Sequence, residues 1–588
     1  MSGFTSDKSD SINRLYDYVK FTASSSGVDE KSSVKYYGAG LNSSEDDTPK
    51  IMRCVNANIN QPSGGIVYIP DGKYKINTPL IVPACANLKF YGTSATFVLE
   101  TGAYIEFNGC SGLELSGIDI VPLTSSSVIV SALRIINCVN FFIHDLDIIG
   151  NSNGILSLNA PVQFANGILI MSTFGFHQTN ILTNCHVMSC TNGIVCASEY
   201  VLMNDLNVLH CSNGIVIPSG NTGVKNSNVT ANRIGIMVYG PNSTYMVPEV
   251  ASSYSNNPDH SAIIGCTINH NTCCGILLNS ATSGYLISSN LIIANGLGTT
   301  SVSSSNPIFL PATLDTYAYD PVGKLYGYGI YIQRCTNLNI VSNFMQQNYI
   351  NIGASAYKNS IITSNTIHNT GTDGNLGVLT RGCIVDFNND NVATSAPSIP
   401  TFTNQYNSIT NNNVVGRPSP AIFGSSNPIL FNGTLVGEGG YIFKGNSGSG
   451  YKQSLRLTTS DTATTGFEAS PSVCVVKSTA VAAFTLTGAY ETYYIDSAAT
   501  ATLSFGKSLD NTSFNIIIKG STTINIVATG LSLADNNVVT GSGLVVSQTG
   551  TAPNITRTFA FSQAGLYRFQ NFVAESATWV IQCPNPTV

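Results

Sequence analysis

Acidic and aromatic side chains gather in two stretches of the sequence, residues 239–261 and 296–329. A tyrosine ring can stack on the apolar face of a sugar, while carboxylates accept hydrogen bonds from the sugar hydroxyls. This mixture of residue types therefore predicts a saccharide-binding site. The expected contacts are tyrosines and polar groups within or just after the two stretches: Tyr239, Tyr245, Tyr254, His260, Tyr317, Tyr319, Lys324, Tyr326, Tyr331 and Arg334.

Carboxylates at such a site could also cleave a glycosidic bond. One carboxylic acid protonates the leaving oxygen, and a second carboxylate activates water or attacks the sugar carbon directly. A separation of about 5–5.5 Å between the two predicts retention of configuration, and one of about 6.5–9.5 Å predicts inversion. The candidates are the four acids of the two stretches and the nearest two acids before them: Glu249, Asp259, Asp315, Asp320, Asp205 and Glu199.

Two other functions remain open at this point. In a β-elimination, a base removes the proton beside a uronic acid carboxylate while a cation neutralises that carboxylate. The residues for this chemistry would be Lys324, Arg334, His260 and Tyr331. A receptor-binding fibre would instead hold a glycan without cutting it. The sequence has neither an acidic trio at calcium-binding spacing nor paired CxxC elements, so no metal and no cofactor is expected.

The sequence around Gly193, Gly214 and Gly235 repeats with a period of 21 residues. This period matches one coil of a parallel β-helix, in which each coil stacks on the one before it. Residues nine and seven before each glycine are polar and those eight and six before are mostly apolar, and Gly154 aligns in the same way. Such alternation predicts a strand that is buried on one face. The outer columns are Asp145, Asn184, Asp205 and Asn226, then Asp147, His186, Asn207 and Asn228; the inner columns are Leu146, Cys185, Leu206 and Ser227, then Ile148, Val187, Val208 and Val229.

The two acidic stretches interrupt this repeat. Gly235 and Gly275 stand 40 residues apart, and Gly275 and Gly329 stand 54 apart. We expect loops inserted at the same stage of neighbouring coils to emerge on one side of the helix and to wall a groove. Polar residues of earlier coils are expected to be structural. Glu114 and Asp119 would be solvated on an outer face, and His144 and His186 lack a metal-binding pattern.

Composition excludes several classes of protein. Only 10% of the 588 residues are charged and the formal net charge is −6, so nucleic acid is not an expected partner, because phosphate binding needs a clustered basic face. No apolar run predicts a membrane span, and the N-terminus lacks the apolar core of a secretory signal. The 15 cysteines include Cys190 and Cys211, each three residues before a repeat glycine. We expect free thiols that fill the core.

Residues 34–82 contain YGA, DDT, GGIVYIP and GKY in that order. This combination resembles the N-terminal module of the pectate-lyase-like superfamily of right-handed parallel β-helices. It is most similar to the form in bacteriophage tailspikes that cut capsular or O-antigen polysaccharide. The resemblance implies a depolymerase of a bacterial surface polysaccharide, three identical chains per assembly and attachment to the phage tail or baseplate. It also implies a place in the virion after synthesis in the host cytoplasm. One departure, GLNSSE in place of a tighter Gly-Asp loop before DDT, changes a loop.

The predicted fold class is therefore all-β, in three zones. Residues 1–33 would form a helix or a capping and attachment segment, and residues 34–450 a right-handed parallel β-helix. Residues 451–588 contain short strands without the 21-residue register, which predicts an antiparallel β-sandwich or jelly-roll-like domain for oligomerisation or glycan binding. Trp579 is expected in the core of this last domain.

Overall fold

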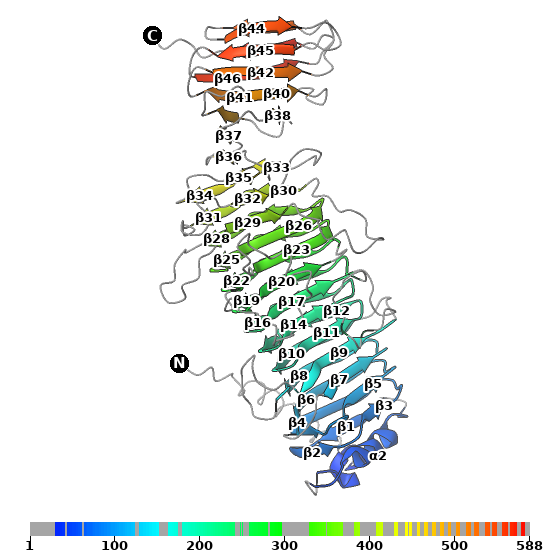
Figure 1. The fold of residues 1–588 in the computed structure, drawn as a ribbon. Helices are drawn as coiled ribbons and strands as arrows, with labels where there is room; N and C mark the ends of the chain where they lie inside the picture. Colours follow the sequence, from blue (N-terminus) through cyan, green and yellow to red (C-terminus); the bar gives the residue numbers. More distant parts are fainter. Residues whose placement is uncertain are drawn as a thin grey trace. The chain divides into compact units, whose positions relative to one another are not determined.

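The computed structural model is all-β apart from short helical segments near residues 30–58, which confirms the predicted parallel β-helix (Figure 1). It describes residues 30–40, 44–61, 64–123, 129–151, 163–173, 179–240, 247, 250, 258–279, 283–296, 328–348, 350–368, 382–387, 407–415, 429–432, 442–444 and 446–449, and strands from 455 to 582. The chain forms two compact units, residues 1–233 with 246–256 and residues 234–245 with 257–588. The domain boundaries proposed at residues 33 and 450 stay predictions.

A short helical module precedes the first coils. It consists of the 3-10 turns η1 (Glu30–Ser32) and η2 (Val34–Tyr37) and the helix α2 (Thr48–Asn58). Pro49 stands in the first turn of α2, where its missing N–H costs no hydrogen bond. Ile51, Cys54 and Val55 are fully buried on the face that α2 turns toward β1 and β3.

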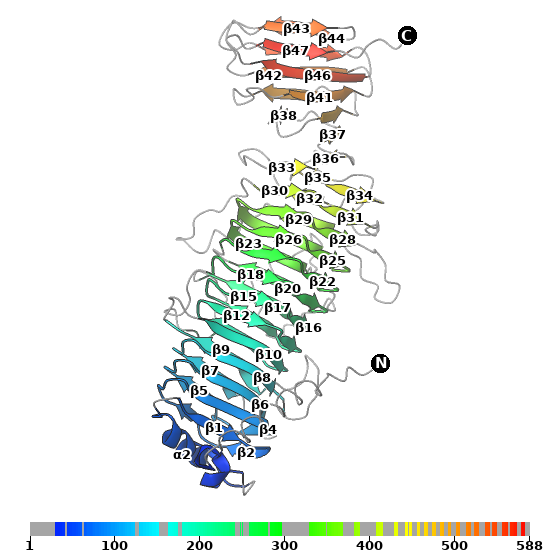
Figure 2. The ribbon, with the colours of Figure 1, turned by 180° about the vertical axis from the view of Figure 1, so that it is seen from behind.

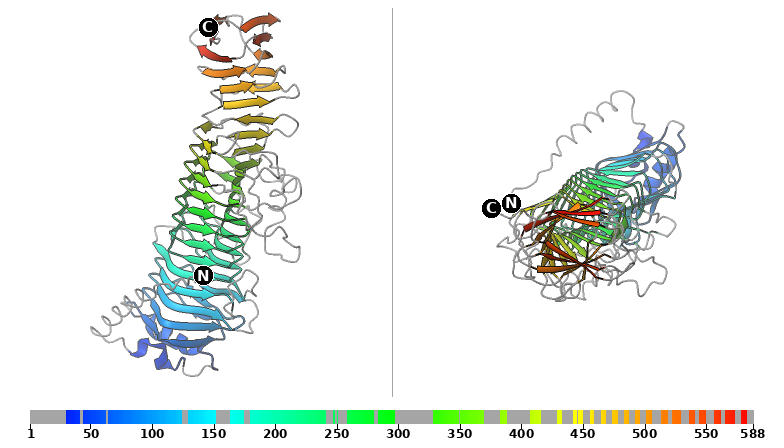
Figure 3. Two further views of the ribbon diagram at one scale, coloured as in Figure 1. Left: turned by 90° about the vertical axis from the view of Figure 1, so that its left-hand side faces the viewer. Right: turned by 90° about the horizontal axis from the view of Figure 1, so that it is seen from above.

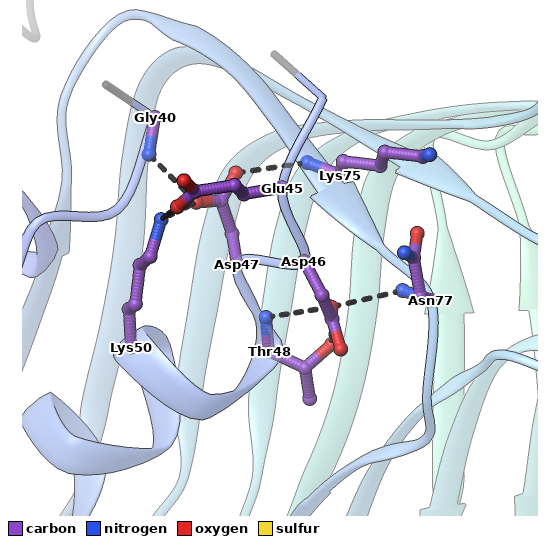
Figure 4. A network of polar contacts seen from close by, with 8 residues as sticks. All are labelled: Gly40, Glu45, Asp46, Asp47, Thr48, Lys50, Lys75 and Asn77. Carbon is purple, nitrogen blue, oxygen red and sulfur yellow. Dashed lines mark hydrogen bonds and ion pairs between the residues drawn. The ribbon is translucent and has the colours of Figure 1, made fainter. Parts of the chain in front are cut away.

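Asp47 of the DDT motif joins this module to the first coil (Figure 4). Its carboxylate is fully buried, and it accepts the backbone N–H of Gly40 at 3.0 Å and that of Lys75 at 3.1 Å. Lys50 Nζ lies 3.3 Å from the same carboxylate. A buried charge needs such partners, so the motif has a structural role.

Asp46 fastens the same module at a second point (Figure 4). Its Oδ1 accepts the backbone N–H groups of Thr48 and Asn77, each at 3.0 Å. Burial raises the pKa of Asp46, but the hydrogen bonds from Asn77 and Thr48 outweigh burial and lower it overall. The carboxylate thus stays ionised where it ties α2 to the end of β2.

The coils of the first unit are built from parallel strands (Figures 1 and 2). One set pairs along the chain as β4–β6–β8–β10, and another as β5–β7–β9–β11–β14. The strands are β1 Ile66–Ile69, β2 Gly72–Ile76, β3 Leu80–Val82, β4 Lys89–Leu99, β5 Ile105–Asn108, β6 Glu114–Pro122, β7 Ile129–Ile136, β8 Phe142–Ile149, β9 Phe164–Met171, β10 Asn180–Met188, β11 Asn192–Ala197, β12 Val201–Asn204, β13 Asn207–Leu209, β14 Asn213–Ile217, β15 Gly223–Lys225 and β16 Asn228–Thr230.

Burial in these coils follows the predicted columns. Leu146, Cys185, Leu206 and Ser227 are at most 2% exposed, whereas the column before them, Asp145 to Asn226, is exposed. That outer column also has a conformational role that the alternation did not predict. Asp145, Asn184, Asp205 and Asn226 all have φ between 48° and 55°, in the left-handed region that Asp and Asn tolerate better than most residues. The column therefore marks a bend of each coil, and β12 ends and β13 begins around it.

The repeat glycines stack because neighbouring backbones approach too closely for a side chain. A Cβ on Gly193 would lie 2.5 Å from the carbonyl oxygen of Gly214, and one on Gly167 would lie 2.6 Å from that of Gly193. Gly193 and Gly214 are thus confirmed as one column. The alignment of the strand before Gly154 is confirmed, since Leu146, Asp147 and Ile148 lie in register with Cys185, His186 and Val187. Gly167 stacks on Gly193, and Gly154 lies outside the described residues.

The second unit continues with the same type of coil, seen as parallel rungs in the left view of Figure 3. A Cβ on Gly235 would meet the Gly275 carbonyl oxygen at 2.5 Å, and one on Gly275 that of Gly329 at 2.6 Å, so the spacings of 40 and 54 join equivalent positions. The strands are β17 Ile234–Tyr239, β18 Ala262–Ile264, β19 Thr267–Asn269, β20 Cys274–Asn279, β21 Leu286–Ser288, β22 Leu291–Ile293, β23 Tyr328–Thr336, β24 Asn339–Val341, β25 Phe344–Gln346, β26 Ile350–Lys358, β27 Ile361–Thr363, β28 Thr366–His368, β29 Gly382–Phe387, β30 Ser408–Thr410, β31 Asn413–Val415, β32 Ile429–Asn432, β33 Ile442–Lys444 and β34 Ser447–Ser449.

Buried asparagines form a ladder inside this unit. The side-chain Nδ2 of each donates to Oδ1 of the next at 2.9–3.0 Å, through Asn290, Asn343, Asn365, Asn412 and Asn446. Each Oδ1 also accepts a backbone N–H from the coil before, as Asn343 Oδ1 does from Asn290 at 3.1 Å. These amides lie in the interior, where they satisfy the backbone at a corner of each coil.

The two acidic stretches leave the coil at different stages. The first follows β17 and precedes β18, and the second follows β22 and precedes β23. β17 and β23 belong to the same set of paired strands, because both pair with β20. The first stretch follows the end of β17, whereas the second precedes the start of β23. The expectation that both interrupt the same stage was therefore wrong.

The C-terminal strands form two sets in which parallel and antiparallel pairs occur together. The chain alternates between the sets, so β37–β39–β41 and β38–β40–β42 pair in parallel, whereas β41–β46, β42–β45, β44–β45 and β46–β47 are antiparallel. The strands are β35 Leu455–Thr458, β36 Thr464–Phe467, β37 Val473–Lys477, β38 Ala483–Leu486, β39 Thr492–Ile495, β40 Ala501–Phe505, β41 Ser513–Ile518, β42 Thr522–Ala528, β43 Asn536–Thr540, β44 Leu544–Thr549, β45 Thr556–Phe561, β46 Gly565–Phe572 and β47 Thr578–Gln582. Trp579 lies in β47, and its side chain is outside the described part.

Among the described residues, no helix has the length and apolarity that a membrane span requires.

Candidate functional site

A column of polar side chains runs along the outside of the first unit on β6, β8 and β10. Asp119 lies in register with Asp147, and Asp147 lies in register with His186. Residues in register on adjacent strands are about 4.8 Å apart, so the two carboxylates are direct neighbours. All three residues are partly exposed, and His186 Nδ1 lies 3.3 Å from Asp147 Oδ1. We call Asp119, Asp147 and His186 the outer acid column.

A charged cluster lies just before this column on β4, β6 and β8. The Glu114 carboxylate is 2.9 Å from Lys89 Nζ and 3.9 Å from His144 Nε2, and His144 Nδ1 is 2.7 Å from Asp145 Oδ2. The other oxygen of Asp145 accepts a hydrogen bond from Asn184 Nδ2 on the next coil. We call Lys89, Glu114, His144 and Asp145 the charged corner.

Phe142 places an exposed aromatic ring on this face. Its side chain is 41% exposed, and the ring stacks on the imidazole of His144 with the centroids 4.3 Å apart. Phe142 is in register with Glu114, so the ring borders the charged corner. An exposed ring beside carboxylates is the combination that can bind both the apolar face and the hydroxyls of a sugar.

The charges of the corner reinforce one another. Burial opposes protonation of His144, but its hydrogen bond with Asp145 and its contact with Glu114 outweigh burial and raise the pKa of His144 to about 9. The interaction with His144, helped by Lys89 and opposed by burial, lowers the pKa of Glu114 to about 2. At neutral pH the corner therefore holds a cationic imidazole between two carboxylates.

This arrangement predicts a stability that depends on pH. The pKa of His144 is higher in the folded chain than its ordinary value of 6.5. The contribution of His144 to the free energy of unfolding is therefore complete below pH 6.5 and is lost as the pH rises through about 9. We expect the His144→Gln variant to lack that loss, which should amount to about 2–3 kcal/mol in the wild type. Urea unfolding at pH 6 and pH 9.5 measures it.

His210→Gln is the matched control for this experiment. Burial lowers the pKa of His210, so this imidazole is already neutral at pH 7 and its removal should leave the slope between pH 6.5 and 9 intact. Equal slopes in wild type and His144→Gln would contradict the proposed ion pairs.

The outer acid column can perform acid–base chemistry. The spacing of adjacent coils, about 4.8 Å, is close to the separation of about 5–5.5 Å between the two carboxyl groups of retaining glycosidases. With two carboxyl groups on adjacent coils, one could attack the sugar carbon while the other protonates the leaving oxygen. Among the described residues, no group of three His, Cys, Asp or Glu side chains is arranged to hold a metal ion.

Many of the residues predicted from sequence lie outside the described part of the chain. These are Glu249, Asp315 and Asp320 of the candidate acids, and Tyr245, Tyr254, Tyr317, Tyr319, Lys324 and Tyr326 of the candidate contacts. Their roles stay predictions.

In the second unit the structure brings Asp259 and His260 close to the coil that carries Arg334. Asp259 forms a parallel bridge with Ser283, and Ser283 forms one with Thr336, two residues after Arg334. His260 is exposed at a left-handed bend, whereas Arg334 is only 8% exposed. Asp259 and His260 thus stay available to a ligand, and most of the Arg334 side chain does not.

Two predicted sugar contacts are in the core. Tyr239 is 0% exposed in β17 and Tyr331 is 1% exposed in β23. Both end up inside because these strands bury successive residues on both faces, so neighbouring side chains do not alternate between core and solvent. The expectation of rings open to a sugar was wrong for these two tyrosines.

Glu199 and Asp205 lie at opposite ends of β12 in the first unit. Asp205 occupies the left-handed bend and accepts a hydrogen bond from Asn204 Nδ2, and Glu199 adjoins the exposed ring of Tyr200. The catalytic roles of the two acids stay predictions.

The sequence predicted that Asp147 and His186 share an outer column, which their register confirms, but it assigned Asp119 to a solvated face apart from them. A signal was present, because GIDIV around Asp119 and DLDII around Asp147 share a polar residue between two buried ones. The coil of Asp119 lies before the aligned repeats, so its register with Asp147 could not be counted from glycines.

Comparison with known proteins finds similar solved structures at low sequence identity. No family model matches the sequence, and no curated protein matches it. Among solved structures, the A-module of a mannuronan C-5 epimerase from Azotobacter vinelandii is 13% identical, covering 73% of this chain and 98% of its own, with a TM-score of 0.43. The Dettilon tailspike protein is 11% identical over 92% of this chain and 89% of its own, also with a TM-score of 0.43. A surface adhesin of Streptococcus pneumoniae is 10% identical over 94% and 98%, with a TM-score of 0.35.

Proposed function

We propose that this chain binds a polysaccharide along the outer wall of the β-helix and cleaves its glycosidic bonds by hydrolysis. The observation that carries the proposal is the in-register pair Asp119 and Asp147, next to His186 on the outside of the first unit. The exposed Phe142 ring and the charged corner supply the neighbouring contacts for a sugar chain. A rod of stacked coils also presents a long surface, which suits a long polymer.

We further propose that the polymer is a capsular or O-antigen polysaccharide and that the protein acts as a tailspike-like depolymerase. The support is the resemblance of YGA, DDT, GGIVYIP and GKY, whose Asp46 and Asp47 hold the N-terminal module in the structure. A homotrimer attached to a phage tail or baseplate, and hence a place in the virion, belongs to the same proposal. The acids Glu249, Asp259, Asp315 and Asp320 are proposed as a second set of catalytic candidates.

The test is to incubate the full chain with purified capsular polysaccharide and lipopolysaccharide and to size the glycan afterwards. Hydrolysis shortens the glycan and creates reducing ends without ultraviolet absorbance from an unsaturated sugar. An unsaturated product would show β-elimination instead. A glycan that is retained on the protein at full length would show a binding fibre and would overturn the catalytic part of the proposal.

A further inference from the structure

Three cysteines lie one above another at a corner of the first unit. The proposed function gives them no role. Cys85 Sγ lies 3.4 Å from Cys110 Sγ, and Cys138 occupies the next coil. The residues that follow them form parallel bridges, Ala86 with Ser111 and Ser111 with Val139. Each cysteine therefore stacks on the one in the coil before.

The backbone spacing at Cys85 and Cys110 suits a disulfide. Residues stacked in this way are about 4.8 Å apart, within the usual Cα separation of about 4.4–6.8 Å across a disulfide. The Ser111 N–H donates to the Cys85 carbonyl oxygen at 2.8 Å, which holds the two coils at this spacing. Closing the gap between the sulfurs to about 2.05 Å thus needs mainly side-chain rotation.

The two thiols differ in their access to solvent. Cys85 is partly exposed, whereas Cys110 is 0% exposed and Cys138 is 1% exposed. The hydrogen bond with Cys110 lowers the pKa of Cys85, against the effect of burial. Since the thiolate is the reactive form, Cys85 is placed to react first and Cys110 to resolve the product.

We propose that Cys85 and Cys110 form a redox site that a hydroperoxide converts into a disulfide. The Cys85 thiolate attacks one peroxide oxygen, the O–O bond breaks and hydroxide leaves, which gives a sulfenic acid. The Cys110 sulfur then attacks the Cys85 sulfur, the S–O bond breaks, and the departing hydroxide takes up a proton to form water. Two thiols lose two electrons in all, and the hydrogen peroxide is reduced to two molecules of water.

The disulfide would link two coils whose cysteines are 25 residues apart in sequence. The disulfide would lie next to the N-terminal module, just after the paired strands β3 and β5. A covalent link across such a loop restricts the unfolded chain, so oxidation would stabilise the first coils of the first unit.

A second pair in the same unit serves as an internal control. Cys190 and Cys211 lie in adjacent coils, but both are 0% exposed, and burial raises the pKa of Cys190. A peroxide in solution should therefore leave this pair reduced while it oxidises the first pair.

The experiment treats the full folded chain with hydrogen peroxide, blocks the remaining thiols with iodoacetamide after unfolding, and maps the peptides by mass spectrometry. We expect a cross-linked Cys85–Cys110 peptide that lacks the mass of two hydrogen atoms and that disappears on reduction. Cys110→Ser should instead accumulate a Cys85 sulfenic acid that dimedone traps, and Cys85→Ser should show neither product. Cys190 and Cys211 should carry the alkyl group throughout.

Two results would overturn the proposal. One is complete alkylation of Cys85 and Cys110 at peroxide concentrations that oxidise free cysteine in the same tube. The other is over-oxidation of Cys85 to the sulfinic acid in the wild type without any link to Cys110. Because both thiols are assayed in the wild-type chain, neither result depends on whether a variant folds.

Discussion

Replacing Asp147 with Asn is expected to lower the rate of polysaccharide cleavage by about 100-fold or more, with the fold unchanged. The amide cannot act as a nucleophile or a base, yet its oxygen can occupy the position 3.3 Å from His186 Nδ1 that Asp147 Oδ1 occupies now. Asp119→Asn should cause a loss of the same order, because an amide does not protonate the leaving oxygen. The measurement is the release of reducing ends from the polysaccharide that the wild type degrades.

The control for this pair is Asp71→Asn. Asp71 is an exposed acid in the turn before β2 and is not part of the outer acid column. Asp71→Asn therefore removes the same charge from the unit as Asp147→Asn does and leaves the column unchanged. Full activity in both Asp119→Asn and Asp147→Asn would remove the column from the mechanism. Replacements at Glu249, Asp259, Asp315 and Asp320 would then test the second set of candidates.

The largest effect on stability is expected from Asn343→Leu. Asn343 is 1% exposed, and its Oδ1 accepts both the backbone N–H and the side-chain Nδ2 of Asn290. Its Nδ2 donates to the Ile287 carbonyl oxygen at 2.9 Å and to Asn365 Oδ1 at 3.0 Å. Leucine has a similar volume but leaves these buried groups without partners, at about 1–3 kcal/mol for each. We expect a loss of about 3–5 kcal/mol in the free energy of unfolding.

Hydrogen exchange is the measurement that localises this loss. Each coil contacts mainly its neighbours, so protection should fall first at the amides of β21, β24 and β27, which pair with one another. Asn339→Ala on the same coil is the matched control. Asn339 is exposed and its backbone N–H keeps its bond to the Tyr285 carbonyl oxygen, so exchange should stay as in the wild type. Unchanged protection in Asn343→Leu would show that the ladder contributes no stability.

The periodicity of the sequence correctly predicted which side chains fill the interior of the β-helix. Val187, Val208 and Val229 recur at one step of a fixed period, and a side chain that is apolar at every recurrence has to face the core of a stacked fold. The glycines obey the same logic, since a close approach between coils excludes a side chain at that step. Both signals repeat along the chain and need no knowledge of distant contacts.

The same rules failed where the coil length changes. Asp119 and Asp147 are 28 residues apart, so the period of 21 residues did not place Asp119 in the outer column that the alignment on the glycines predicted for Asp147 and His186. The interior asparagines were overlooked for a related reason. A polar residue in sequence predicts an outer position, whereas Asn343 is buried with its amide bonded to the Ile287 backbone carbonyl on the coil before and to the Asn365 side chain on the coil after.

By itself, then, the sequence determined that the chain winds into parallel coils, which residues fill them, and that an N-terminal module with a DDT motif starts them. Periodicity is a local property, and it is written into each coil separately. Only the tertiary structure decided which acids become neighbours, that Tyr239 and Tyr331 are buried, and that the two acidic stretches leave the coil at different stages. Those outcomes depend on how many residues each coil has in its turns. Backbone pairing between coils, and not the type of side chain, sets that number.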